Sequence, residues 1–152
     1  MQLALFEPDI PQNAGALLRT GACLQVPLHI IEPAGFDASD RALRRAGLDY
    51  IEQARMLRHG SFEAFDQWRQ AEGCRLILLT TSAQQAYAEF RFHTGDALLL
   101  GRESAGVPPH VHAAADARLR VPISSNTRSL NVAVAAAMVL GEGLRQTDGW
   151  PA

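Results

Sequence analysis

The chain alternates short apolar runs with polar or amphipathic stretches, and most of the runs end at Gly, Pro or a polar turn. The clearest run is Arg75 to Thr81, whose Leu and Ile residues follow one another without alternation, as in a strand covered on both faces. Leu3 to Phe6, Val26 to Ile31 and Ala97 to Leu100 are further predicted strands, and Arg118 to Ile123 is expected to be the last one.

Helices are predicted between these runs, and small or polar residues mark their ends. Asn13 and Ser61 are suited to N-caps, whereas Gly47 and Gly73 are suited to helix ends. The predicted helices span residues 13–24, 40–46, 61–72 and 108–115. Strands that alternate with helices favour an α/β fold with a mostly parallel sheet, here as a single domain over residues 1–152.

The most unusual stretch is the nearly uncharged segment Leu130 to Leu140, which follows a polar loop, Ser124 to Arg128. Its Ala, Leu and Met content predicts a helix, with Ser129 as the N-cap and no polar face until Glu142. The helix is therefore expected to be buried on most sides. Because eleven residues are too few to cross a membrane, it should lie in the core or in a subunit interface.

Composition narrows the class of protein. The net charge of −2 gives no overall basic signal for nucleic acid, although all 14 basic residues are Arg, whose planar fork suits phosphate. Cys23 and Cys74 are isolated, which indicates a reducing compartment and no zinc site. The N-terminal stretch has no basic region followed by a long apolar segment, so we expect a cytoplasmic protein.

Three polar loops follow predicted strands and should meet at the carboxyl edge of the sheet, where open α/β sheets bind ligands. The first, Pro8 to Arg19, is by itself more typical of an ordinary capped helix with a surface Arg. The second, Gly101 to Pro108, lacks the Lys-Ser/Thr of a phosphate loop, and it could be a structural turn. The third is the polar loop Ser124 to Arg128 with the start of the helix after it, where Asn126, Arg128, Ser129 and Asn131 are more hydrogen-bonding side chains than a plain crossover needs.

Other kinds of site have less support. His110 and His112 would share a strand face, but two ligands without a third make a poor metal site, so no metal is expected. His29, His59 and His93 are scattered along the sequence. Neither a Ser-His-Asp nor a Cys-His grouping stands out.

A set of ordered motifs points further. They are P-Q-N-A-G with Arg19, then L-L-L-G-R-E-S-A-G-V-P, then V-P-I with R-S-L-N-V-A-V-A. Together they resemble the SPOUT superfamily of S-adenosylmethionine-dependent RNA methyltransferases. L-H-I-I-E-P-A-G-F, at Leu28 to Phe36, and R-R-A-G-L-D-Y, at Arg44 to Tyr50, resemble its group of tRNA wobble-nucleotide ribose 2′-O-methyltransferases. The resemblance covers nearly the whole chain.

This resemblance implies a fold and a cofactor. The fold would be an α/β sheet flanked by helices, with a C-terminal trefoil knot, and the protein would work as a homodimer without a metal. S-adenosyl-L-methionine would lie bent in the knot, held largely by backbone groups. The matching cofactor-binding positions are Leu79, Gly101, Glu103, Val121, Ile123, Ser129, Leu130 and Asn131.

The resemblance also implies a reaction. The ribose 2′-hydroxyl of nucleotide 34, a cytidine or modified uridine in the anticodon stem-loop of leucine tRNAs, would be methylated. Arg19, held by Asn13, would be catalytic. Because a guanidinium has a pKa above ~12 and no acceptor, Arg19 is expected to clamp a phosphate and stabilise the alkoxide. The expected RNA contacts are Arg41, Arg44, Arg45 and Arg128.

Two positions depart from the family pattern, and two other functions stay open. Arg102 stands where close relatives usually carry Pro, and Gly141 stands where some carry an aromatic residue. One alternative is a non-catalytic RNA-binding protein of the same fold. The other is a flavodoxin-like domain that binds FMN or a phosphate, although the chain has no hydroxyl-rich phosphate loop.

Overall fold

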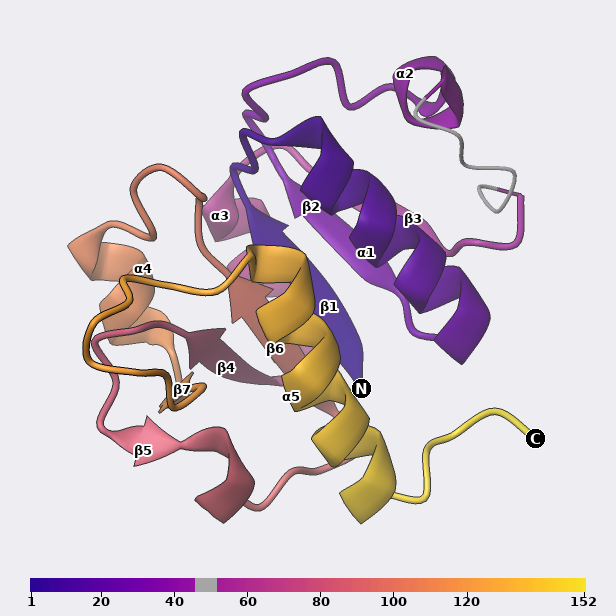
Figure 1. Ribbon diagram of the computed structural model, residues 1–152. Coiled ribbons are helices and arrows are strands. Elements are labelled where there is room, and N and C mark those ends of the chain that lie inside the picture. The colour runs from indigo at the N-terminus through magenta and orange to yellow at the C-terminus, as the bar shows by residue number, and fades with distance from the viewer. Residues whose placement is uncertain (46–51) are drawn as a thin grey trace.

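A sheet of parallel strands forms the centre of the structure, a computed structural model that describes residues 1–45 and 52–152 (Figure 1). The strands are β1 (Gln2–Phe6), β2 (Leu28–Ile31), β3 (Met56–His59), β4 (Arg75–Leu79), β5 (Gln85–Ala86), β6 (Asp96–Leu100) and β7 (Ala117–Arg120). Their order in the sheet is β3-β2-β1-β6-β4-β7-β5, and every pairing between these strands is parallel. The predicted mostly parallel α/β sheet is therefore confirmed.

Five strands were expected from the sequence, and they correspond to β2, β1, β6, β4 and β7, which form the middle of this sheet. The prediction of a strand through Ile123 was wrong, because β7 ends at Arg120 and the chain then leaves the sheet. The strands β3 and β5 were not predicted. β3 is short and only half-buried, and β5 has two residues, so neither needs a continuous apolar run.

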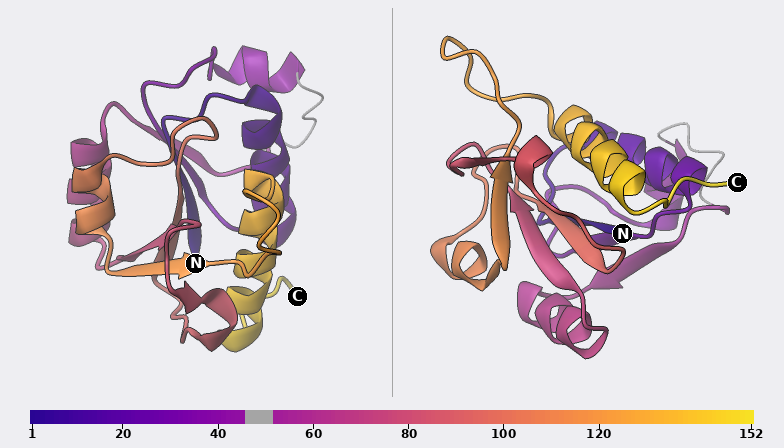
Figure 2. Two further views of the ribbon diagram at one scale, coloured as in Figure 1. Left: turned by 60° about the vertical axis from the view of Figure 1, so that its left-hand side comes forward. Right: turned by 90° about the horizontal axis from the view of Figure 1, so that it is seen from below.

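Helices cover both faces of the sheet (Figure 2). The helices α1 and α5 lie side by side on one face, whereas α3 and α4 lie on the other. The bounds are α1 (Pro11–Leu24), α2 (Asp40–Arg45), α3 (Phe62–Ala71), the 3₁₀ helix η1 (Tyr87–Glu89), α4 (Pro109–Ala114) and α5 (Val132–Gln146). All predicted helices are thus present, with shifted ends.

The predicted N-caps were only partly right. Ser61 caps α3 as expected, since its hydroxyl accepts from the Ala64 N–H at 3.1 Å. Asn13 does not cap α1, because Pro11 already opens that helix and the N-cap position falls on Ile10. The expected helix end at Gly47 lies outside the described residues.

The start of α5 also differs from the prediction. The chain is not yet helical at Ser129, and the N-cap is Asn131. Its side-chain Oδ1 accepts from the N–H groups of Ala133 at 2.9 Å and Val134 at 3.2 Å. The cap therefore comes two residues later than expected, which leaves Ser129 and Leu130 in the loop.

Two apolar cores sit on the two faces of the sheet. Residues of β4 alternate between them: Ile77 packs with α1 and α5, whereas Leu76 and Leu78 pack with Phe65 of α3 and Val111 of α4. All five side chains are fully buried. This double coverage explains the unbroken apolar run, and each such side chain contributes about 1.5–3 kcal/mol of burial free energy.

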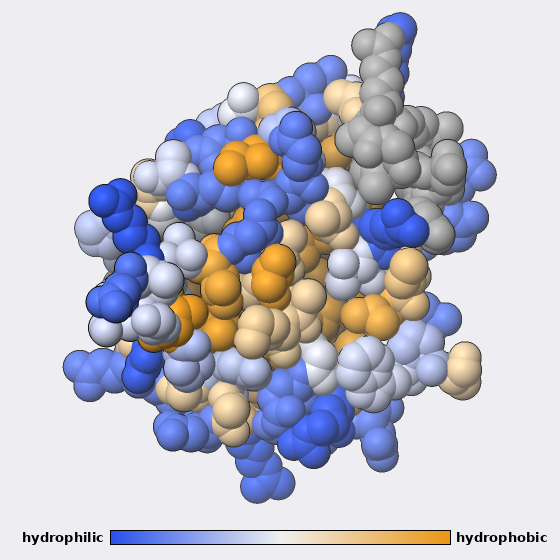
Figure 3. All heavy atoms as spheres, viewed as in Figure 1, coloured by the Kyte–Doolittle hydropathy of each residue, from blue (hydrophilic) through white to orange (hydrophobic). Residues whose placement is uncertain are grey.

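The helix α5 is not buried on most sides, contrary to the prediction. Ala136 and Leu140 face the sheet, but Val134 is 50% exposed and Met138 is 42% exposed. With the 39% exposed Leu130 they form an apolar stripe at helical spacing, and apolar side chains gather over α5 on this face (Figure 3). No helix in the described part of the chain has the length and apolar character needed to span a bilayer.

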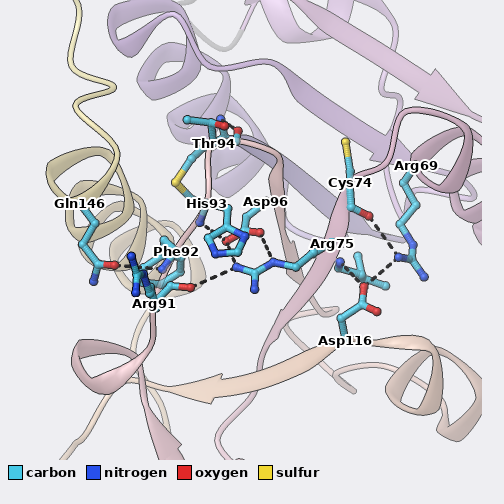
Figure 4. A network of polar contacts seen from close by, with 12 residues as sticks. Arg69, Cys74, Arg75, Arg91, Phe92, His93, Thr94, Asp96, Asp116 and Gln146 are labelled. Atoms are coloured by element: carbon cyan, nitrogen blue, oxygen red, sulfur yellow. Dashed lines mark hydrogen bonds and ion pairs between the residues drawn. The ribbon is translucent and has the colours of Figure 1, made fainter.

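Ion pairs hold the amino ends of the central strands (Figure 4). The guanidinium of Arg75, at the start of β4, contacts both oxygens of the fully buried Asp96 at 2.7 Å. Arg69 of α3 lies 2.9 Å from Asp116, whose Oδ2 also accepts from the Leu76 N–H at 2.7 Å. These contacts tie β4 to β6 and to the loop before β7, at the edge opposite the predicted ligand site.

Candidate active site

A pocket of about 560 Å³ opens at the carboxyl ends of β4, β6 and β7. Its walls are the last residues of these strands, the loop after β6 and the segment from β7 into α5. It contains every position that the family resemblance assigns to the cofactor. These are Leu79, Gly101, Glu103, Val121, Ile123, Ser129, Leu130 and Asn131.

Strand register brings these positions together. Leu79 at the end of β4 pairs with Leu100 of β6 and with Leu119 of β7, so the three strands end at nearly the same level. The residues that follow, among them Gly101 and Val121, therefore emerge beside one another at the edge of the sheet. The site lies at this edge because three buried strands end there and are each followed by a polar loop.

Gly101 is required by the shape of the loop after β6. Arg102 and Gly106 exchange backbone hydrogen bonds at 2.9 and 2.8 Å, which doubles the loop back on itself. A Cβ at Gly101 would lie 2.8 Å from the Gly106 backbone, and Gly106 itself has a φ of +64°. The two glycines thus form a compact turn, and no side chain covers their backbone where it lines the pocket.

A chain of side-chain hydrogen bonds joins the pocket walls. The buried Asn13 of α1 donates to Glu103 Oε1 at 3.2 Å and accepts from Asn131 Nδ2 at 2.9 Å. Glu103 Oε2 accepts from the backbone N–H of Asp9 at 3.0 Å. The loop after β1, the loop after β6 and the start of α5 are therefore fixed to one another through Asn13 and Glu103.

Charged groups stand behind the loop after β6. Arg102 lies 3.3 Å from Glu7 and 3.7 Å from Asp9, which gives this guanidinium two carboxylate partners. Hydrogen bonds with Glu103 and with the Ser104 hydroxyl, together with the charge of Arg102, lower the pKa of Asp9 to about 2. Asp9 is therefore ionised at neutral pH.

The predicted catalytic and RNA-binding arginines do not all meet at the pocket. Arg128 lines it, but Arg19 is exposed on α1 and is not among the lining residues. Arg41 is exposed and lines a separate hollow. The side chains of Arg44 and Arg45 lie outside the described part of the structure.

One further cation was missed by the sequence analysis. Arg120, the last residue of β7, lines the same pocket as Arg128. Its position directly after the buried Leu119 was the available signal, because residues that end a parallel strand reach the ligand edge.

The histidines are arranged differently from the expectation. His110 and His112 lie on α4 and not on a strand. His29 and His59, which are scattered in the sequence, are adjacent in space, with His29 Nδ1 2.9 Å from His59 Nε2. Among the described residues no three His, Cys, Asp or Glu side chains are grouped in a way that could hold a metal ion.

Known proteins share this architecture over nearly the whole chain. Residues 1–141 match the SpoU rRNA Methylase family. The tRNA (cytidine(34)-2′-O)-methyltransferase of Ancylobacter novellus is 57% identical over 150 residues, covering 99% of this chain and 95% of that protein. The enzyme of the same name from Beijerinckia indica is 61% identical over 144 residues, covering 95% and 90%.

A solved structure agrees with the sequence matches. It is described as giving structural insights into the 2-OH methylation of C/U34 on tRNA, and it superposes with a TM-score of 0.88 at 42% identity. The superposition covers 95% of this chain and 94% of that one. With a family match that spans most of its length and relatives above half identity, the chain belongs to the SpoU rRNA Methylase family.

Proposed function

We propose that this protein is a tRNA 2′-O-methyltransferase that transfers a methyl group from S-adenosyl-L-methionine to the ribose of nucleotide 34, a cytidine or modified uridine. The observation that carries the proposal is the convergence of all the matched cofactor positions on one pocket. The activity named for the relatives from Ancylobacter and Beijerinckia supports the same reaction.

The pocket suits this methyl donor. Its volume of about 560 Å³ lies in the range that small-molecule ligands fill. Leu79, Val121 and Ile123 offer apolar walls for a purine ring, and the bare backbone at Gly101 permits close approach. Glu103 places a carboxylate in a pocket that would receive the positively charged sulfonium and ammonium groups.

The chain's own contribution is alignment and electrostatics. The bound donor supplies an electrophilic methyl group, so the protein must hold the ribose 2′-oxygen in line with it. Such alignment can lower the barrier by roughly 7–11 kcal/mol. Asn13 and Glu103 fix the walls through their hydrogen bonds, and Arg120 and Arg128 place guanidinium groups at the pocket for RNA phosphates.

Arg19 is proposed to stabilise the alkoxide as it forms and to clamp a neighbouring phosphate. A guanidinium cannot accept a proton, so the hydroxyl proton would leave to a phosphate oxygen or to water. Arg41, with Arg44 and Arg45 on the same helix, is proposed to contact the RNA at a distance from the pocket. Binding of tRNA should therefore weaken as salt rises.

A second copy of the chain is proposed to complete each site. Arg19 is exposed and absent from the pocket of its own chain, while the stripe of Leu130, Val134 and Met138 leaves apolar surface beside the pocket. A homodimer that covers this stripe would bury that surface and bring Arg19 of one subunit to the other's pocket.

Subunit mixing tests this arrangement. Arg19→Ala leaves the pocket intact, whereas Gly101→Ala is expected to disable it. Random mixing of the two inactive variants should restore about a quarter of wild-type activity if Arg19 acts across the interface, because half of the dimers then hold one complete site. Mixtures that stay inactive, although subunits exchange, would contradict the proposal.

The finer features implied by the family are proposals as well. We propose a single methyltransferase domain whose C-terminal segment is threaded as a trefoil knot. The sheet order supports this, because β7 comes after β5 in the sequence but lies between β4 and β5 in the sheet. The C-terminal part of the chain must therefore insert between two segments that precede it. Cytoplasmic leucine tRNAs, recognised at the anticodon stem-loop, are the proposed substrates.

Methyl transfer to total tRNA, followed by mapping of the modified nucleotide, tests the function. We expect a 2′-O-methyl group at nucleotide 34 and none on a matched tRNA with a 2′-deoxyribose there. Arg19→Ala should lose turnover but keep its affinity for S-adenosyl-L-methionine. A protein that binds tRNA but leaves every ribose unmethylated would instead be a non-catalytic binder, and methylation of a base would exclude the proposed chemistry.

A further inference from the structure

Asp9 stands behind the pocket wall without lining the pocket. Its contacts converge on one short segment, the loop after β6. The Asp9 backbone N–H donates to Glu103 Oε2 at 3.0 Å, and Asp9 Oδ1 accepts from the Glu103 N–H at 3.2 Å. The Ser104 hydroxyl donates to Asp9 Oδ2, and Arg102 Nη2 lies 3.7 Å from the same oxygen.

The contacts of the Asp9 side chain require its ionised, carboxylate form. Two hydrogen-bond donors, the Glu103 N–H and the Ser104 hydroxyl, bind its two oxygens, the Arg102 guanidinium lies nearby, and Asp9 is ionised at neutral pH. An amide of the same shape would carry no charge to match that of Arg102, and in one of its two orientations its NH₂ group would face the Glu103 N–H. The side chain is only 18% exposed, so such a mismatch would be poorly relieved by water.

Space for Asp9 is also built into the fold. A Cβ at Gly35 would lie 2.9 Å from Asp9 Cβ, and the Gly35 N–H donates to the Pro8 carbonyl at 2.8 Å. The segment after β2 therefore packs directly against Asp9. Asp9 has a fixed position from which to hold the loop.

We infer that Asp9 is a positioning residue for the methyl-donor site: it fixes Glu103 and the loop that carries it. The inference rests on the proposed function, since it assigns Asp9 to the same pocket. Asp9 acts at both ends of Glu103, because its N–H orients the carboxylate and its carboxylate anchors the backbone. The Glu103 side chain then has one orientation in which to bond both Asn13 and Asp9.

Calorimetric binding of S-adenosyl-L-methionine to Asp9→Asn tests the inference. The variant should bind about tenfold more weakly than wild type, the effect of losing roughly one charge-assisted hydrogen bond. The matched control is Asp66→Asn, which also removes an aspartate from an Arg pair, at 2.7 Å on α3, but lies away from the pocket. It should bind the donor as wild type does.

A double-mutant cycle separates positioning from a general structural role. If Asp9 acts through Glu103, Asp9→Asn should cost less than about twofold in donor affinity in a Glu103→Gln background. The inference would be overturned if the losses of donor affinity caused by Asp9→Asn and Glu103→Gln were independent and multiplied in the double variant. It would also be overturned if Asp9→Asn bound the donor with wild-type affinity. If Asp9→Asn does not fold, Ser104→Ala, which removes one donor to Asp9, should show the same coupling. Wild-type protein that bound no donor would refute the proposed function and the inference that depends on it.

Discussion

Acid should destabilise this protein through one buried histidine. His29 of β2 is fully buried, with its ring 4.3 Å from that of Trp68 and stacked on His59. Gln2 directs its amide N–H₂ to Cys74 Sγ, so its carbonyl is left to accept from His29 Nε2–H at 2.6 Å. His29 Nδ1 must then accept from His59 Nε2–H at 2.9 Å, and a second proton on His29 would face a donor.

The size of the effect follows from the pKa of His29. Burial, followed by the charges of His59 and Arg55, lowers it from 6.5 to about 4. Because the folded state has the lower pKa, the unfolded chain takes up the proton first as pH falls. Stability is therefore full above pH 6.5 and declines down to about pH 4. At 1.36 kcal/mol per pKa unit, the loss is about 3 kcal/mol, a large share of a typical 5–15 kcal/mol.

Urea unfolding at several pH values between 7 and 4 measures this loss. His29→Gln removes the titrating group, so its free energy of unfolding should be lower at pH 7 but should fall less with acid than that of wild type. The difference between the two curves should shrink by about 3 kcal/mol over this range. His93→Gln, a change at an exposed histidine, is the control and should keep the wild-type slope. Parallel curves for wild type and His29→Gln would refute the reasoning.

Further changes probe the pocket, a cap and a buried charge. Gly101→Ala should weaken donor binding at least about tenfold in calorimetry, because the new Cβ would lie 2.8 Å from the Gly106 backbone. Gly60→Ala is the control and should bind the donor as wild type does, because a Cβ there meets nothing within 4 Å. Ser61→Ala should lower the free energy of unfolding by about 1 kcal/mol through loss of the α3 cap, and an unchanged Tm would contradict this. Arg75→Met should cost about 3 kcal/mol in urea unfolding, since it leaves the buried Asp96 carboxylate without its guanidinium, and a neutral result would show that water replaces that partner.

The centre of the fold could be predicted because burial on two faces leaves a mark in the sequence. The run in β4 is apolar at every position from Leu76 to Leu79, as a strand between two helix layers requires. The edge strands β3 and β5 carry no such mark, since one face or one side of each meets solvent. The cap of α5 was predicted at the wrong residue because Ser129 and Asn131 are both suitable, and the long-range hydrogen bond that Asn131 donates to Asn13 leaves no local mark in the sequence.

The pocket could be located from the sequence, but the contacts that shape it could not. Polar loops after parallel strands must meet at one edge, so Glu103 and Asn131 were placed together by topology alone. The bond between Asp9 and Glu103 joins residues 94 positions apart, and that between His29 and His59 joins residues 30 apart. No local sequence pattern encodes such pairs, because the two residues come close together only after the strands have paired in register.

Leu130 belongs both to the pocket and to the surface proposed as a subunit interface. Leu130 lines the pocket and is also the first member of the exposed stripe that continues to Val134 and Met138. The pocket rim and the exposed apolar stripe thus share Leu130. Covering the stripe would exclude water from one side of the pocket and order the rim together. In the proposed dimer, association between subunits and closure of the site would therefore be coupled physically, because both would bury Leu130.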